Sequence, residues 1–68
     1  MIEVNNNVYL VEAGKIYCAI IRDFRAKDIF KTSVKVDWVI NNKWHYNHWV
    51  NPDDIYMDYV EAKAVIKK

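Results

Sequence analysis

Glycine, proline and cysteine are nearly absent from this chain, since its 68 residues include one of each. A collagen-like or low-complexity chain would be rich in glycine and proline, so both classes are excluded. A glycine-rich phosphate-binding loop is excluded for the same reason. The single cysteine, Cys18, cannot form an internal disulfide, which favours a reducing compartment.

Long apolar runs and an excess of one charge are also missing. The longest unbroken apolar run, Ile16–Ile21, has six residues, whereas a membrane-spanning helix needs about 20. No basic segment followed by an apolar one opens the chain, so secretion is not indicated. Ten Lys and Arg residues against nine Asp and Glu residues give a net charge of +1, which argues against a protein that coats nucleic acid. We therefore expect a cytoplasmic protein with no membrane contact.

The abundant residues are those that favour strands. Val and Ile together number 17, against one Leu, and ten residues are aromatic. Side chains that are β-branched or aromatic fit a pleated surface better than a helix. With 53% hydrophobic residues, the chain does not belong to the disordered class. We predict one small domain spanning residues 1–68, and self-association would help so small a core.

Turn residues divide the first half of the chain. Asn5–Asn7 predicts a turn or a bulge, and Glu12–Lys15, which holds the only glycine, predicts a hairpin loop. The centre of Lys15–Phe24 is apolar on both faces, which predicts a central strand that is covered on two sides. Arg25–Lys31 predicts a charged connection, anchored on the core by Ile29–Phe30.

Residues 33–40 and 43–50 predict a hairpin whose register depends on the length of its loop. A two-residue loop at Asn41–Asn42 would pair Trp38 with His45 and so mix apolar and polar side chains on one face. A three-residue loop instead gives mostly apolar pairs. These pairs are Ile40–Trp44, Trp38–Tyr46, Val36–His48 and Val34–Val50. The face that they share is predicted to lie in the core, with Trp38, Trp44 and Tyr46 as a core cluster. Because a one-residue slip moves every side chain to the other face, we predict the second register.

The face opposite those pairs is the predicted binding surface. Trp49 lies there, and an exposed tryptophan ringed by polar groups is typical of a binding hot spot. Its indole would also serve to stack a nucleic-acid base. The alternative is that the C-terminal segment folds over Trp49 and covers it. The predicted partner-binding residues are Trp49, Lys35, Asp37, His45 and Asn47.

The C-terminal segment carries signals of a helix. Asn51 is a suitable N-cap, Pro52 suits the first helical position, and Asp53–Asp54 complement the positive end of a helix dipole. An apolar stripe at helical spacing follows, formed by Ile55, Tyr59, Ala62 and Ile66. A turn at Pro52–Asp54 followed by a last strand is the alternative. We predict the helix, because its capping and charge order agree with its period.

Three groups of residues invite a chemical interpretation, and each also has a structural one. His45 and His48 would point to opposite faces of a strand, so we predict no metal site. Cys18 lies within the most apolar run, where a thiol is buried and inert. Asp53 and Asp54 stand where the start of a helix favours acids. We therefore predict no enzymatic activity and no cofactor.

The whole pattern predicts an α+β fold, a small twisted antiparallel meander of four or five strands with a C-terminal helix. The strand spacing and the turn WVNPDDI at residues 49–55 resemble small SH3-like or Tudor-like barrels at the level of the fold alone. That resemblance implies an all-β SH3-like barrel as the alternative fold. It also implies binding of peptides or nucleic acids through aromatic and polar loops.

We expect a small, non-enzymatic cytoplasmic binding protein that docks on a larger protein partner. Its size and its content of Asn, Lys, Ile and Tyr, whose codons are A/T-rich, fit an accessory protein of a phage or mobile element, such as an inhibitor of a host factor. One alternative is a nucleic-acid-binding module that uses Lys35, Lys43, His45 and Trp49. Another is a structural subunit that self-associates as a homodimer.

Overall fold

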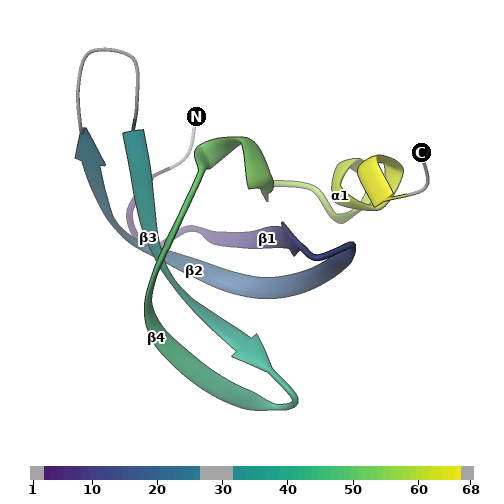
Figure 1. Ribbon diagram of the computed structural model, residues 1–68, viewed down its shortest axis with the longest axis horizontal. Coiled ribbons are helices and arrows are strands. Elements are labelled where there is room, and N and C mark those ends of the chain that lie inside the picture. Colours follow the sequence, from purple (N-terminus) through teal and green to yellow (C-terminus); the bar gives the residue numbers. More distant parts are fainter. Residues whose placement is uncertain (1–2, 27–31, 67–68) are drawn as a thin grey trace.

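The chain folds into a five-stranded antiparallel sheet with a helix near its C-terminal end (Figure 1). This computed structural model describes residues 3–26 and 32–66. The predicted anchor at Ile29–Phe30 lies outside the described residues. The elements in chain order are β1 (Asn7–Glu12), β2 (Lys15–Ala26), β3 (Thr32–Ile40), β4 (Lys43–Val50), the 3₁₀ helix η1 (Pro52–Asp54), β5 (Ile55–Tyr56) and α1 (Tyr59–Ile66).

The order of strands across the sheet is β4-β3-β2-β1-β5, and neighbouring strands are antiparallel. The first four strands form a meander, after which η1 leads the chain to the far edge, where β5 pairs with β1. Within the described residues β4 and β5 remain separate edges, so the sheet is not a closed barrel. The predicted small α+β meander is confirmed, and the alternative of an all-β barrel is wrong.

One side of the sheet, here called the core face, carries the hydrophobic core. The crossing from β4 to β5 runs over this side, because Val50 and Ile55 at its two ends are both buried in the core. η1, which lies within the crossing, contacts both β1 and β3. The buried core residues are Val8, Leu10, Ala19, Ile21, Val34, Val36, Val50 and Ile55, with Tyr17, Phe24 and Trp38 packed against them.

The opposite side of the sheet, here called the outer face, carries the alternate side chains of the same strands. Tyr9 lies between the core residues Val8 and Leu10 along β1, so its side chain points to the outer face. Cys18, its cross-strand partner on β2, shares that face. α1 contacts β1, β5 and β2, and its Tyr59 meets Tyr9 edge-on with 5.5 Å between the ring centroids. Because α1 packs near the β5 edge, it leaves the middle of the outer face uncovered.

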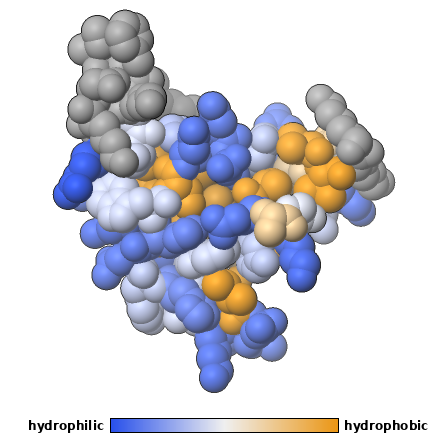
Figure 2. Space-filling model, viewed as in Figure 1, coloured by the Kyte–Doolittle hydropathy of each residue, from blue (hydrophilic) through white to orange (hydrophobic). Residues whose placement is uncertain are grey.

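The helix also leaves some of its own apolar side chains in solvent. Ala62 is the buried residue of α1, whereas Val60 and Val65 are exposed. Figure 2 shows an apolar patch over α1 and a separate one near the β3–β4 turn, with hydrophilic groups between them. On this view the exposed apolar surface is therefore divided into separate patches.

Asparagine supplies most of the left-handed backbone of the described chain. Asn5, Asn41, Asn42 and Asn47 have positive φ angles between 53° and 72°. Asparagine tolerates this region better than most residues that carry a Cβ. Asn41 and Asn42 together form the two-residue turn between β3 and β4, in which both residues need a positive φ.

The β3–β4 hairpin combines both registers that the sequence allows. Near the turn Trp38 pairs with His45, as a two-residue loop requires. Beyond a bulge in β4, Val36 pairs with His48 in the other register. The predicted three-residue loop is therefore wrong, whereas the predicted pairs at the base of the hairpin are confirmed. One extra residue at the bulge compensates for the shorter loop.

This bulge changes which aromatic side chains face the core. Trp38 packs against the core, as predicted. Trp44 pairs with Val39 and so lies on the outer face, and Tyr46 lies at the bulge; both are exposed. The prediction that Trp44 and Tyr46 are core residues is wrong, because only the part of β4 beyond the bulge keeps the expected alternation.

The C-terminal segment combines the two interpretations of its sequence. Asn51 caps η1 rather than a long helix, and its side-chain oxygen accepts the Asp53 N–H at 2.9 Å. β5 follows, and α1 then begins at Tyr59, just after Asp58. The Asp58 carboxylate accepts the Val60 N–H at 2.9 Å, which makes Asp58 the N-cap. The predicted helix exists, but it starts later than predicted, after a short turn and strand.

The β1–β2 turn offers a test of the backbone conformation. Ala13 has a φ of 52° and Gly14 a φ of 74°, and alanine is strained there because its Cβ crowds the backbone. Asn-Gly is the preferred pair in such a turn. We expect Ala13→Asn to raise the free energy of unfolding by about 0.5–1 kcal/mol in denaturant titrations. Ala13→Val, a β-branched control, should lower it, and equal stability of the two variants would contradict the turn geometry.

Candidate functional site

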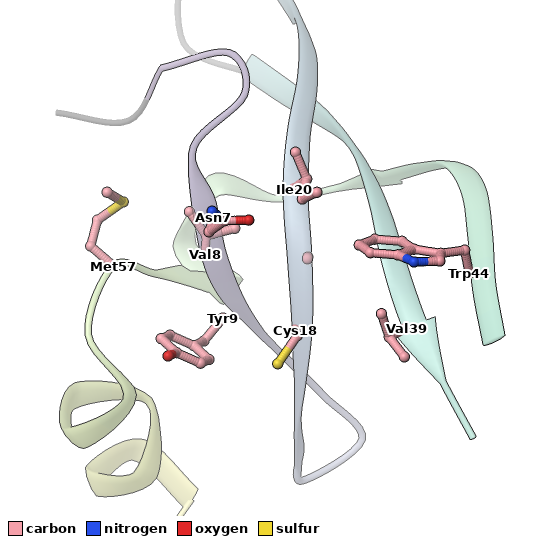
Figure 3. Close-up of a pocket in the computed structure, with 9 residues that line it drawn as sticks. Asn7, Val8, Tyr9, Cys18, Ile20, Val39, Trp44 and Met57 are labelled. Atoms are coloured by element: carbon pink, nitrogen blue, oxygen red, sulfur yellow. The ribbon is translucent and has the colours of Figure 1, made fainter. Parts of the chain in front are cut away.

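A groove of about 370 Å³ crosses the middle of the outer face. Trp44 on β4 and Met57 beyond β5 stand on opposite sides of it, and the Trp44 ring extends over β3 (Figure 3). Both side chains are about half exposed, at 46% and 48%. The groove therefore presents apolar surface that another apolar group can cover. Its floor includes Tyr9, Cys18, Ile20 and Val39.

Cys18 belongs to the floor of this groove and is exposed. The prediction that Cys18 is buried is wrong. The apolar centre of β2 predicts cover on both faces. The crossing through η1 covers the core face, whereas α1 covers the outer face only near the β5 edge. The apolar run Ile16–Ile21 is thus also the sequence signal for the groove, although sequence reasoning assigned it to the core alone.

A charged row lies beside the groove on the outer face. Asp23 on β2 pairs with Lys35 on β3, and Lys35 pairs with Trp49 on β4, so the three side chains share this face. The guanidinium carbon of Arg25 lies 5.0 Å from the centroid of the Trp49 ring, a cation–π contact. Trp49 remains 38% exposed. The structure thus brings Trp49 and Lys35 together and adds Asp23 and Arg25, which sequence reasoning missed.

Asp37 holds the β4 bulge and offers little surface to a partner. Its Oδ2 accepts a hydrogen bond from Arg22 Nε at 2.9 Å, and its Oδ1 accepts the Asn47 N–H at 3.2 Å. Arg22 also donates to Asn5 Oδ1 at 3.0 Å. The expectation that Asp37 borders an exposed site is wrong, because the residue is only 7% exposed. Asn47 is exposed, but its backbone belongs to the bulge, with a φ of 60°.

His45 and Lys43 lie apart from Trp49. The register pairs His45 with Trp38, which places His45 on the core side of the edge strand, and Lys43 follows the same alternation. The expectation that His45 shares a face with Trp49 is therefore wrong. The predicted nucleic-acid-binding set is divided as well, with Lys35 and Trp49 on the outer face and the other two residues on the core side.

His48 links strands from opposite parts of the sheet. Its Nε2 lies 3.0 Å from Glu12 Oε1 on β1, and its ring stacks on Trp38 with 4.4 Å between centroids. Trp38 in turn meets Tyr17 edge-on at 4.9 Å. The bulge puts His45 on the same side as His48, so the prediction of opposite faces is wrong. These contacts give His48 a packing role.

Side chains that ligate metals do not gather in the described residues. No set of three or more His, Cys, Asp or Glu side chains lies close enough there to hold a metal ion. Asp53 and Asp54 are exposed in η1, where the Asp54 N–H donates to the Asn51 carbonyl oxygen at 3.0 Å. Across residues 3–26 and 32–66, no helix has the length and apolar character needed to cross a membrane.

The apolar groove and the charged row beside it distinguish the outer face from the rest of the described surface. Comparison of the chain with family models, curated proteins and solved structures finds no match. The function must therefore be inferred from the chemistry of these two features.

The Asp37 contacts give a measurable prediction. Asp37→Ala leaves the Arg22 guanidinium and the Asn47 N–H without this acceptor in a part-buried site. We expect a loss of about 1–3 kcal/mol in the free energy of unfolding, measured by chemical denaturation. Asp54→Ala, which removes an exposed carboxylate, is the matched control and should change stability by less than about 0.5 kcal/mol. Similar losses in both variants would show that Asp37 does not hold the bulge.

Proposed function

We propose that this protein is a non-enzymatic interaction module that docks on a protein through its outer face. The observation that carries the proposal is the uncovered apolar groove between Trp44 and Met57. Contiguous exposed apolar surface on a small protein usually marks an interaction site. Trp, Tyr and Arg are enriched among residues that dominate binding energy. All three types occur on this face, as Trp44, Trp49, Tyr9 and Arg25.

The lining of the groove supports binding rather than catalysis. Cys18 is the nucleophilic side chain in it, and no His, Asp or Glu is among the described residues that line it. A nucleophile without an adjacent base is weakly reactive. The groove is instead rich in apolar side chains whose transfer out of water is favourable, such as Trp44, Ile20 and Val39.

A protein partner suits the outer face better than a nucleic acid. Binding to nucleic acid depends on cations that neutralise several phosphates. On the outer face Lys35 is the cross-strand partner of the acidic Asp23, and Arg22 is paired with Asp37. The net charge of +1 adds no general attraction for phosphates. Mixed charges beside an apolar centre are instead typical of protein interfaces.

Within this proposal the module acts in the cytoplasm on a larger protein, as an accessory protein of a phage or mobile element that inhibits a host factor. Its small size supports that role, because a single docking surface is enough to block a partner. The many Asn, Lys, Ile and Tyr residues, whose codons are A/T-rich, support an A/T-rich source.

Trp44→Ala tests the docking surface. A tagged copy, purified from its native cells together with an untagged copy, should retain a bound protein in constant ratio. Loss of a hot-spot tryptophan costs about 2 kcal/mol or more of binding free energy, so Trp44→Ala should weaken binding roughly 30-fold. Tyr46→Ala, an exposed aromatic outside the groove, is the matched control and should bind like the wild type.

Equal retention by Trp44→Ala and by the wild type would contradict the proposal. So would the absence of any bound protein, the untagged copy included. Recovery of RNA or DNA that is lost steeply as salt increases would favour the nucleic-acid alternative instead.

A further inference from the structure

The outer face carries an order of side chains that is complementary to itself. The two adjacent strands β2 and β3 hold Asp23 and Lys35 as direct cross-strand partners of opposite charge. Nearer the groove, the same two strands hold Cys18 and Val39, both apolar and short. At these two levels each side chain of β2 is thus matched on β3 by one that can contact it favourably. At the level between them Ile20 pairs with Asp37.

The flanking strands add an aromatic pair at the level of the groove. Tyr9 on β1 pairs with Cys18, and Trp44 on β4 pairs with Val39. Consider a second sheet that faces this one, related by a two-fold axis parallel to the strands and midway between β2 and β3. In that arrangement β2 of one copy lies opposite β3 of the other, and β1 lies opposite β4. Tyr9 and Trp44 would then lie opposite each other in the two copies.

We propose that a second copy of this chain covers the outer face, in a two-fold dimer whose axis runs along the strands between β2 and β3. The proposal rests on the docking surface of the proposed function, and it makes a second copy of the chain, rather than a larger protein, the occupant of that surface. Asp23 of each copy then faces Lys35 of the other copy. Because the axis repeats this contact, the dimer contains two ion pairs between the copies. This charge complementarity selects a second copy over an unrelated partner.

Apolar side chains fill the centre of the dimer. Trp44 of each copy lies over Tyr9 of the other and beside its Met57, within the groove that these side chains border (Figure 3). The short side chains of Cys18 and Val39 at the axis let the two sheets approach to about 10 Å, the usual spacing of packed sheets. The half-exposed Trp44 and Met57 then leave water.

Asp37, a charged group near the centre, is already hydrogen-bonded within each copy. Asp37 faces Ile20 across the interface, and its carboxylate is bonded to Arg22 and to the Asn47 N–H. Docking therefore buries no unpaired charge at this point. A standard interface buries about 800 Å² per partner, which is about one sixth of the 5105 Å² accessible surface of one copy.

Charge reversal tests the symmetry directly. Lys35→Asp and Asp23→Lys each place like charges opposite each other at both symmetric contacts. Each variant alone should raise the dimer dissociation constant roughly tenfold or more in analytical ultracentrifugation. An equimolar mixture of the two variants brings opposite charges together again at both contacts and should restore the dimer. Lys43→Asp changes the net charge by the same amount as Lys35→Asp. Because Lys43 lies on the core side, this variant should dimerise like the wild type.

Cys18 gives a second readout in the wild-type protein. Because it lies near the proposed axis, its reaction with a maleimide should slow as the protein concentration rises through the dissociation constant. The same protein unfolded in urea should react at one rate at every concentration.

A wild-type protein that sediments as a monomer up to millimolar concentration would overturn the dimer, and so would a mixture no more dimeric than its separate components. A labelling rate of Cys18 that is independent of concentration would overturn it too. If a different protein still co-purifies in a Trp44-dependent way, only the second copy is excluded as the occupant. If neither co-purifies, the proposed function fails as well.

Discussion

The surface of this protein depends on one extra residue in β4, which the Asp37 carboxylate holds in place. The Asn41–Asn42 turn sets one register at the tip of the hairpin, and the bulge at Asn47 restores the other register at its base. Because side chains alternate along a strand, that residue decides which rings enter the core. Trp38 packs inside and Trp44 borders the groove. The candidate docking surface is therefore the consequence of a backbone irregularity.

Apolar alternation predicts the strands and the base of the hairpin from sequence, but it cannot locate the bulge. Val34 and Val50 are buried as predicted, because they lie beyond the bulge, where the expected alternation holds. Trp44 lies between the turn and the bulge, so the same rule assigns it to the wrong face. At the bulge the Asn47 N–H donates to Asp37, which is also bonded to Arg22, 15 residues earlier in the chain. A local pattern does not record that contact, and each aromatic assignment in β4 depends on it.

Small domains bury a lower fraction of their surface than large ones. In this protein the described residues outside the sheet cover one of its sides and a part of the other. The crossing through η1 covers the core face, whereas the eight-residue α1 packs near an edge. β2 nevertheless carries apolar side chains on both faces, as a strand with two covered faces does. The prediction of a buried Cys18 fails because α1 leaves this part of the outer face uncovered. The same pattern explains why an interface is the natural interpretation of the outer face.

The edges of the sheet are less suited to association than its outer face. β4 is a long edge strand, and an unprotected edge invites pairing with another chain. The bulge at Asn47 interrupts that edge, and Lys43 adds a charge to it. β5, at the other edge, has two residues. Bulges, charges and short strands all oppose edge pairing, so the outer face is better suited than either edge to the proposed association. The irregular β4 hairpin therefore has two effects that favour the proposed contact, because the bulge interrupts the β4 edge and Trp44 is left exposed on the outer face.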